Sequence, residues 1–284
     1  MKGIIWLASY PKSGNTWMRT FISNYMSEKD EPVNINELNT DGIASGRKVF
    51  EDMVGVESSY LAPDEIDKLR PEVYVRLSEE TDRTLFVKVH DAYIYIDKNM
   101  PLIPTKNCKF IYIARNPLDV AVSLSFHIGK SIEKTVDKMC DENFCFGDKS
   151  ERYSQQFRQK LLSWTGHVES FLNNKSLDLK LIRYEDMKSN PLKTFTEVVE
   201  FCELDMDEKR IKKAIEFSDF KVLKKQEQET GFKERSIHSE NFFREGKTGS
   251  WKDKLTEKQI QKIIDKNKKT MEKLGYLLNN EVNL

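Results

Sequence analysis

The feature that most constrains this chain is a polar turn that directly follows an apolar run near its start. Residues 3–8 read Gly-Ile-Ile-Trp-Leu-Ala, and residues 9–17 continue as Ser-Tyr-Pro-Lys-Ser-Gly-Asn-Thr-Trp. Proline, serine and glycine end the apolar run, and the residues after them are suited to begin a helix. Such a turn presents backbone N–H groups at a helix N-terminus, where they bind phosphate-like anions. The sequence therefore predicts an anion-binding loop between a strand and a helix.

This loop differs from the P-loop of nucleotide-binding proteins in the position of its lysine. A P-loop reads GxxxxGK[ST], and its lysine directly follows the second glycine to reach the β and γ phosphates. Here Asn15 follows Gly14, and the loop's lysine, Lys12, lies two residues before that glycine. The loop is therefore predicted to bind an anion other than the nucleoside triphosphate tail.

Composition is consistent with one domain over residues 1–284, because no proline-, glycine- or serine-rich linker divides the chain. Lys plus Arg and Asp plus Glu both number 46, so no net charge favours nucleic acid or an anionic membrane. The four cysteines lack zinc-site spacing and are interpreted as small buried or half-buried thiols. The N-terminal apolar run is too short for a signal peptide or a membrane helix. We expect a soluble, cytoplasmic protein with no membrane partner.

Apolar runs that alternate with helix signals predict an α/β fold, a single domain with a central parallel sheet flanked by helices. The strands are expected at residues 3–9, 84–90, 109–114 and 177–183. The helices are expected at residues 16–27, 63–79, 118–127, 152–173, 191–202, 207–217 and 256–274. Residues 28–61 are assigned no structure, and residues 226–250 are expected to form a long mobile loop that serves as a lid. Because ligands bind beyond the carboxyl ends of such strands, the residues after each strand should meet in one crevice.

Three segments resemble the sulfotransferases that use 3′-phosphoadenosine 5′-phosphosulfate (PAPS). Pro-Lys-Ser-Gly-Asn-Thr-Trp at residues 11–17 is similar to the family's 5′-phosphosulfate loop, which commonly reads YPKSGTTW. Residues 111–123 resemble its 3′-phosphate segment, and residues 243–252 resemble its RxGxxGxWK loop. The three segments occur in the family's order and bracket nearly the whole chain. The resemblance implies a P-loop-like 5′-phosphosulfate loop, PAPS as the donor and 3′-phosphoadenosine 5′-phosphate (PAP) as the product.

The resemblance also implies which residues perform the transfer. Backbone N–H groups of residues 13–16 and the Thr16 hydroxyl would hold the 5′-phosphate, while Lys12 would stabilise the bridging oxygen as the S–O bond breaks. Lys88-Val89-His90 matches the family's KxH segment. His90 would then be the general base, and Lys88 a second cation near the transferred group. The alternatives are a solvated surface lysine at residue 12 and a structural histidine at residue 90.

The 3′-phosphate would be held by residues of the second and third segments. A guanidinium and a hydroxyl can together bind a phosphate, as Arg115 and Ser123 would. The alternatives are a surface ion pair between Arg115 and Asp119, and a Ser123 hydroxyl bonded to its own helix backbone. From the third segment the resemblance adds Arg244, Gly246 and Lys247.

The third segment also departs from the family pattern, and further aromatic residues match it. Glu245 stands where the family often has lysine, so it receives no binding role. Trp17 and Phe220 match positions where the family packs adenine between aromatic faces, and Tyr184 matches a tyrosine near the nucleoside. The alternative for these aromatic side chains is simple core packing. The implied donor-binding residues are Lys12, Ser13, Gly14, Asn15, Thr16, Trp17, Arg115, Ser123, Tyr184, Phe220, Arg244, Gly246 and Lys247.

The predicted activity is transfer of a sulfuryl group to a hydroxyl or amine of a small-molecule acceptor. Sulfuryl transfer moves less charge than phosphoryl transfer, so fixed N–H donors and one lysine can serve without a metal. Neither a metal nor a nucleic-acid partner is expected. The sequence does not indicate which oligomeric state the protein adopts. Six aromatic and methionine residues either line an acceptor pocket or pack the core: Phe50, Met53, Tyr60, Tyr93, Phe144 and Phe146. A P-loop kinase of small molecules and a non-catalytic nucleotide-binding module remain as alternatives.

Overall fold

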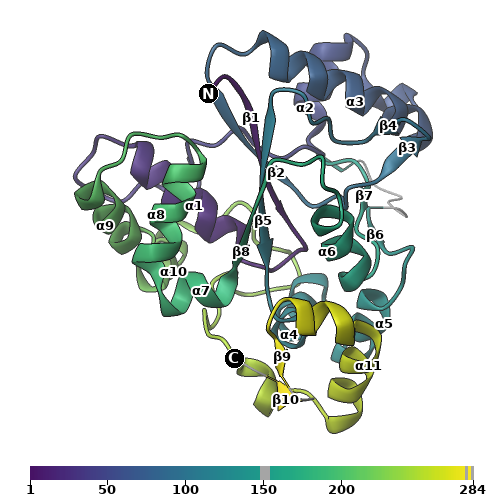
Figure 1. Ribbon diagram of the computed structural model, residues 1–284, viewed down its shortest axis with the longest axis vertical. Helices are drawn as coiled ribbons and strands as arrows, with labels where there is room; N and C mark the ends of the chain where they lie inside the picture. The colour runs from purple at the N-terminus through teal and green to yellow at the C-terminus, as the bar shows by residue number, and fades with distance from the viewer. Residues whose placement is uncertain (148–153, 279–280, 283–284) are drawn as a thin grey trace. The chain divides into compact units, whose positions relative to one another are not determined.

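A computed structural model of the protein describes residues 1–147, 154–278 and 281–282. The fold is α/β, with a central parallel sheet flanked by helices, as the sequence predicts (Figure 1). The sheet has the strand order β2-β1-β5-β8. Its strands are β1 (Gly3–Ser9), β2 (Thr84–Val89), β5 (Cys108–Ala114) and β8 (Leu179–Arg183). The predicted strands are confirmed, with ends that move by at most two residues.

Burial on both faces explains why β1 and β5 read as continuous apolar runs. All seven residues of β1 are buried, and so are residues 110–114 of β5. β1 pairs with β2 in parallel, from Gly3 opposite Thr84 to Ala8 opposite Val89. This register aligns the carboxyl ends of the two strands, so Ser9, the last residue of β1, and His90, the residue after β2, lie at the same edge of the sheet.

The chain divides into two compact units, which are described separately. The first comprises Met1–Tyr10, Asp41–Tyr112 and Asp141–Lys180, and the second comprises Pro11–Thr40, Ile113–Cys140 and Leu181–Leu284. Besides sheet strands, the first unit holds α2 (Arg47–Val54), η1 (Ser58–Tyr60), α3 (Pro63–Glu80), β3 (Tyr95–Asp97), β4 (Met100–Pro101), β6 (Cys145–Phe146), β7 (Gln159–Lys160) and α6 (Trp164–Leu172).

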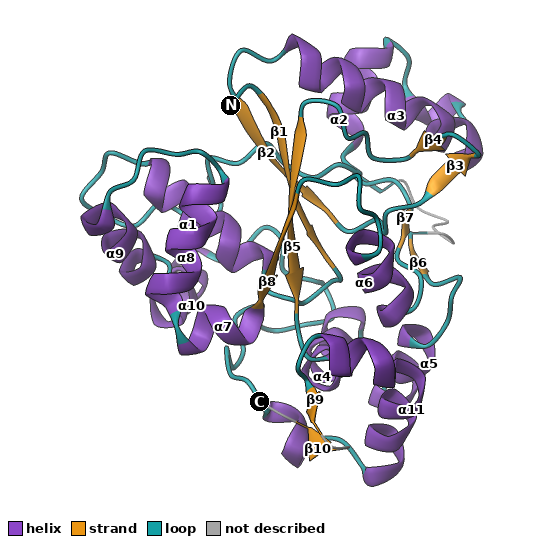
Figure 2. Ribbon diagram, in the orientation of Figure 1, coloured by secondary structure: helices purple, strands orange, loops and turns teal. Residues whose placement is uncertain are grey.

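The second unit is mainly helical (Figure 2). Its elements are α1 (Asn15–Met26), α4 (Pro117–Ile128), α5 (Ile132–Met139), α7 (Tyr184–Ser189), α8 (Pro191–Phe201), α9 (Glu208–Phe217), α10 (Phe220–Thr230), η2 (Ser250–Asp253), α11 (Glu257–Lys273), β9 (Leu277–Leu278) and β10 (Glu281–Val282). Within this unit α9 packs against both α1 and α8, and α4 packs against α5, α11 and η2.

Two predictions about the first unit are wrong. Residues 28–61 are not without structure, because α2 and η1 form there and α2 buries Phe50. The helix predicted at residues 152–173 is confirmed only as α6, and its first two residues lie outside the described part of the chain. Two local features delay its start. Leu162 has φ of 60°, which is not helical, and Ser163 caps α6 by accepting a hydrogen bond from the Gly166 N–H.

One prediction about the second unit needs a smaller correction. The loop expected at residues 226–250 begins later, because α10 continues to Thr230. It also ends one residue earlier, because η2 begins at Ser250. Asp219 caps α10 by accepting from the Lys221 N–H, and Gly231 ends it with φ of 73°. The segment between these two elements, residues 231–249, contains no helix or strand.

A buried ionic cluster stabilises the first unit behind His90. The Arg70 guanidinium on α3 is fully buried and donates to Asp91 at 2.7 Å and to the Tyr74 hydroxyl at 2.9 Å. Asp91 also accepts from the Lys160 N–H at 3.0 Å. These partners raise the pKa of Arg70 despite its burial, so the guanidinium stays charged. Asp91 is the residue after His90, so the cluster holds the chain where β2 ends.

Removing Arg70 should therefore be costly. Arg70→Met leaves the Asp91 carboxylate buried without its cation, which should lower the free energy of unfolding by about 3–5 kcal/mol. The matched control is Arg76→Met on the same helix, where an exposed pair with Glu80 should contribute less than about 1 kcal/mol. Urea unfolding followed by circular dichroism measures both. Equal, small losses would show that the cluster does not stabilise the fold.

A second buried group, His167 on α6, joins α6 to the end of β2. Its Nε2–H donates to the His90 carbonyl at 3.0 Å, and its Nδ1 accepts from the Tyr112 hydroxyl at 2.8 Å. Both ring nitrogens are satisfied in this neutral form. Burial lowers the pKa of His167 to about 4.

This buried imidazole should make the fold sensitive to acid. The unfolded chain takes up a proton near pH 6.5, but the folded chain resists it down to about pH 4, so stability falls as pH drops through this range. Between pH 7 and pH 5 the loss attributable to His167 should be roughly 2 kcal/mol. Urea unfolding at both pH values, in the wild type and in His167→Gln, isolates it. If both proteins lose the same stability on acidification, His167 is not the titrating group.

Candidate functional site

The loop at residues 10–14 joins β1 to α1 in an unusual backbone conformation. Lys12 has φ of 70° and Gly14 has φ of 103°, both in the left-handed half of conformational space. A Cβ atom at Gly14 would lie 2.7 Å from the Tyr184 ring, so only glycine fits there. α1 begins at Asn15, and no side chain caps this end of the helix. A helix N-terminus without a side-chain cap is suited to bind an anion.

Arg115, at the end of β5, is a buried cation of the second unit. Its side chain donates to the carbonyl oxygens of Lys12 and Lys247, each at 3.0 Å, and lies 4.3 Å over the Tyr184 ring. The residue is 8% exposed, and its Nε has no hydrogen-bond partner among the described residues. Carbonyl oxygens and a ring face carry no formal negative charge. The guanidinium is thus held in place with its positive charge uncompensated by these partners.

The expected alternative, a surface ion pair between Arg115 and Asp119, is wrong. Asp119 is itself buried, and its carboxylate accepts from the Gly249 N–H at 2.8 Å, the Ser250 hydroxyl at 3.1 Å and the Trp251 N–H at 3.2 Å. Asp119 therefore binds the start of η2 to α4. Ser123 is half-buried one turn further along α4.

The glycine-containing loop before η2 packs closely against α10. Gly246 has φ of 60°, and a Cβ atom there would lie 2.2 Å from the Phe220 ring. The Arg244 guanidinium lies 3.2 Å from the ring centre of Phe126 on α4. Glu245, at the position where lysine was expected, forms ion pairs with Lys254 and, at 3.7 Å, with Arg244. Hydrogen bonding to Lys254 lowers the pKa of Glu245, so this carboxylate stays charged and paired.

The aromatic residues predicted to contact the nucleoside pack against other side chains of the second unit. Trp17 packs edge-on against Tyr184 at 5.8 Å and Phe195 at 5.7 Å, and Phe220 packs against Gly246 and Phe243. Trp17 and Phe220 are half-buried and Tyr184 is buried. All of the predicted donor-binding residues thus lie in the second unit.

Lys12 is not a solvated surface lysine. Its side chain is half-buried, and its ammonium nitrogen lies 3.9 Å from the ring centre of Phe242 in the segment 231–249. Its carbonyl is held by Arg115. Backbone and side chain of Lys12 are therefore both fixed from within the second unit.

Lys88 and His90 lie in the first unit, at the end of β2. The two are separated by one residue, so they share a face of the strand. The Nδ1 of His90 lies 2.7 Å from the Ser9 carbonyl oxygen. A carbonyl can only accept, so Nδ1 carries the proton and Nε2 carries the lone pair of the neutral ring. This is the tautomer that a general base requires.

Sequence reasoning missed the residues that support this site. His167 received no role, yet it holds the His90 carbonyl. Glu227 and Phe242 were also unnoticed, although Glu227 accepts from the Phe242 N–H at 2.6 Å. Contacts such as the one between His167 and His90 join segments that are far apart along the chain. No sequence motif or residue spacing predicts such contacts. The sole available signal was that Phe242 lies two residues before Arg244.

The donor-site residues suit a ligand with two phosphates. Besides Arg115 Nε, the Ser13 hydroxyl is fully buried and has no hydrogen-bond partner among the described residues. Buried polar atoms of this kind are costly unless a ligand satisfies them. Other buried polar atoms of this unit also lack a partner among the described residues, Ser23 Oγ and Asn116 Nδ2 among them. Ser13 and Arg115 stand out by position, because one lies in the loop between β1 and α1 and the other at the end of β5, as the 5′- and 3′-phosphate assignments would require.

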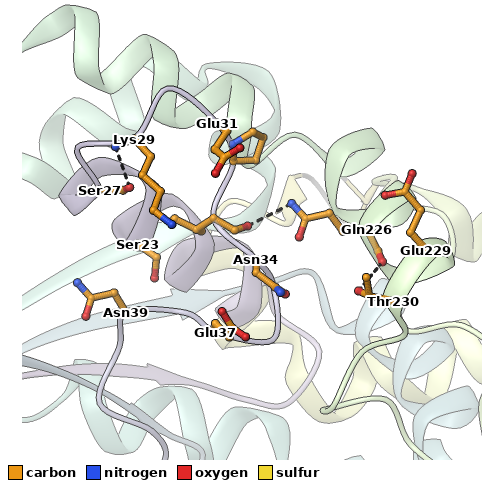
Figure 3. A pocket seen from close by; sticks show the side chains of 12 residues that line it. Ser23, Ser27, Lys29, Glu31, Asn34, Glu37, Asn39, Gln226, Glu229 and Thr230 are labelled. Atoms are coloured by element: carbon orange, nitrogen blue, oxygen red, sulfur yellow. Dashed lines mark hydrogen bonds between the residues drawn. The ribbon is translucent and has the colours of Figure 1, made fainter.

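Three further observations describe the surroundings of the site. Across residues 1–147, 154–278 and 281–282, no group of three or more His, Cys, Asp or Glu side chains is placed to hold a metal ion. The described helices include none long and apolar enough to cross a membrane. A cavity of about 450 Å³ in the second unit is lined by residues such as Ser23, Asn34, Glu37 and Gln226 (Figure 3). None of the predicted donor-binding residues lines it, so it is distinct from the donor site.

Comparison with known proteins identifies the family. The family described as Sulfotransferase domain matches residues 2–275. Flavonol 3-sulfotransferase of Flaveria bidentis is 26% identical over 286 aligned residues, which cover 95% of this chain and 81% of that protein. The structure of mouse sulfotransferase SULT7A1 complexed with PAP aligns with a TM-score of 0.61 at 20% identity, over 95% of this chain and 84% of that one.

A further solved structure shares the fold. Retinol dehydratase in a complex with retinol and PAP aligns with a TM-score of 0.63 at 16% identity, over 99% of this chain and 83% of that one. At these identities the structural likeness shows the fold alone. The family match, however, spans nearly the whole chain and contains all three segments that carry the sequence resemblance. This chain therefore belongs to the sulfotransferase family.

Proposed function

We propose that this protein transfers the sulfuryl group of PAPS to a hydroxyl or amine of a small-molecule acceptor. The observation that carries the proposal is the buried Arg115 guanidinium, whose hydrogen-bond partners are two neutral carbonyl oxygens and whose Nε is unsatisfied. A buried cation of this kind gains most from an anionic ligand. The 3′-phosphate supplies that anion, and it distinguishes PAPS from ATP.

The donor would be bound entirely by the second unit. The Ser13 hydroxyl and the N–H groups at the start of α1 would donate to the 5′-phosphate oxygens, and the Thr16 hydroxyl would add a further donor. Arg115, Ser123, Arg244 and the backbone at Gly246 and Lys247 would hold the 3′-phosphate. Trp17, Tyr184 and Phe220 would contact the nucleoside. The fold relatives SULT7A1 and retinol dehydratase, both solved with PAP, support this choice of ligand.

The transfer itself needs a base and a cation. His90 Nε2 takes the proton of the acceptor hydroxyl or amine while that oxygen or nitrogen forms a bond to sulfur. The bond between sulfur and the bridging oxygen of the donor breaks, and Lys12 stabilises the negative charge that this oxygen gains. Lys88, on the same strand face as His90, supplies a second positive charge. PAP and the sulfated acceptor are the products.

The two alternative functions receive less support. A P-loop kinase would need a lysine directly after Gly14, and Asn15 occupies that position. A non-catalytic nucleotide-binding module would not require His90 in the tautomer that a general base needs. The cytoplasmic location, the single domain over residues 1–284 and the absence of metal and nucleic-acid partners stay predictions. A small-molecule acceptor is supported by the relatives named for a flavonol and solved with retinol.

Donor binding is tested by thermal unfolding with PAP. A ligand at 100 times its Kd stabilises the fold by about 2.7 kcal/mol, so PAP should raise Tm by several degrees while ATP with Mg²⁺ has little effect. Gly246→Ala should weaken PAP binding about tenfold or more, because the new Cβ pushes on Phe220. Gly55→Ala is the control, since φ there is also positive, at 76°, but no atom lies within 4 Å of the new Cβ. The donor assignment would be contradicted if ATP with Mg²⁺ raised Tm as much as PAP does. It would also be contradicted if PAP raised the Tm of Gly246→Ala and of Gly55→Ala equally.

The role of His90 is tested by substitution. His90→Gln removes the base and should lower kcat by about 10²- to 10⁴-fold while the Kd for PAP changes little. The control is His238→Gln, since His238 is exposed and has no assigned role. Sulfated product is measured by mass spectrometry with labelled PAPS and a panel of phenols, alcohols and amines. If His90→Gln turns over at the wild-type rate, another group is the base.

A further inference from the structure

A carboxylate lies among the cations that would hold the 3′-phosphate. Glu245 stands between Arg244 and Gly246, two residues assigned to that phosphate. The side chain of Glu245 is half-buried, and its Oε1 atom forms ion pairs with Lys254 and, at 3.7 Å, with Arg244. A negative charge at this place repels a phosphate unless a neighbouring cation neutralises it. The site therefore needs a counter-charge for Glu245.

The hydrogen bond of Glu245 goes to Lys254 and not to Arg244. The Lys254 ammonium group donates to Glu245 Oε1, whereas the 3.7 Å between this oxygen and the Arg244 guanidinium is too long for a hydrogen bond. Hydrogen bonding to Lys254 is also the largest cause of the lowered pKa of Glu245. Lys254 is therefore the main counter-charge of this carboxylate.

Arg244 has its other contact on α4. Its guanidinium lies 3.2 Å from the ring centre of Phe126. Phe126 and Ser123 are three residues apart on this helix, so their side chains share one face of it. Arg244 thus lies over the face of α4 that carries Ser123, which is also assigned to the 3′-phosphate.

Lys254 is held in place by the end of η2. Its N–H donates to the Trp251 carbonyl at 3.1 Å, and Trp251 is buried. The start of η2 is bound to α4 through Asp119, as described above. The fold therefore brings Lys254 to Glu245, nine residues earlier in the chain, from an element that is anchored on the same helix as Ser123.

We propose that Lys254 is a positioning residue for the 3′-phosphate site, because it neutralises Glu245 and keeps this carboxylate from hydrogen-bonding Arg244. With Glu245 paired to Lys254, the Arg244 guanidinium keeps its N–H groups for the phosphate. Without Lys254, the carboxylate binds Arg244 and competes with the donor. This inference rests on the proposed function, since it requires the 3′-phosphate at Arg244.

The first test removes the charge of Lys254. Lys254→Met should raise the Kd for PAP about three- to fivefold, because Glu245 then pairs with Arg244. The Kd for adenosine 5′-phosphate, which has no 3′-phosphate, should change by less than about 1.5-fold. Lys266→Met is the control, since Lys266 is exposed on α11 and has no assigned role, and it should leave both Kd values unchanged. Isothermal titration calorimetry at low ionic strength, where screening is weak, measures them.

A double-mutant cycle with Glu245→Gln makes the test specific. Glu245→Gln removes the negative charge, so PAP should bind as tightly as in the wild type or up to about fivefold more tightly. In this background Lys254→Met should change the Kd for PAP by less than about 1.5-fold. A loss as large as in the wild-type background would show that Lys254 contacts the ligand itself. Weaker PAP binding by Glu245→Gln would show that the carboxylate is needed by the site. Either result overturns the proposal.

Kinetics give an independent readout. At saturating PAPS, Lys254→Met should raise the KM for PAPS and leave kcat within about twofold of wild type, whereas an equal loss in kcat would contradict a role confined to donor binding. A wild-type protein that binds PAP no more tightly than adenosine 5′-phosphate would refute the proposed donor site. A wild-type preference for PAP that Lys254→Met leaves unchanged would refute this inference alone.

Discussion

The buried guanidinium of Arg115 is the interaction on which the donor half of this protein depends. It lies at the end of β5 and hydrogen-bonds the carbonyl oxygens of Lys12 and Lys247, which are 235 positions apart in the sequence, while stacking on Tyr184. A single cation thereby joins the loop after β1 to the loop before η2. The carbonyls and the ring carry no formal charge, and the buried Glu185 carboxylate interacts with the same cation. The contacts that hold the backbone therefore leave the guanidinium able to bind an anion.

The same physical principle recurs at the other reactive groups. The Lys12 ammonium group lies 3.9 Å from the centre of a ring, and His90 donates from Nδ1 to the Ser9 carbonyl. In each case this supporting partner carries no formal charge. Carboxylates are instead placed where they stabilise backbone. Asp119 binds three groups at the start of η2, and Glu227 binds two N–H groups before Arg244.

Local signals made the sheet and the loop after β1 predictable, because continuous apolar runs and the Pro-Lys-Ser-Gly sequence depend on neighbouring residues. The errors arose where distant contacts decide the structure. α2 forms in a polar stretch because it buries the single residue Phe50, and the helix expected from residue 152 starts instead at Trp164. The support of His90 by His167 joins residues 77 apart, which no spacing rule could reveal. Candidate residues were therefore predictable, and their partners were not.

The central claim is that the buried Ser13 hydroxyl and the buried Arg115 Nε, which have no hydrogen-bond partner among the described residues, bind the two phosphates of PAP. A crystal structure of the protein with PAP tests it most directly. The account predicts one phosphate within hydrogen-bonding distance of the Ser13 hydroxyl and the first N–H groups of α1, and the other within reach of Arg115 Nε. Electron density for PAP at saturating concentration that leaves Ser13 and Arg115 without phosphate contacts would contradict it.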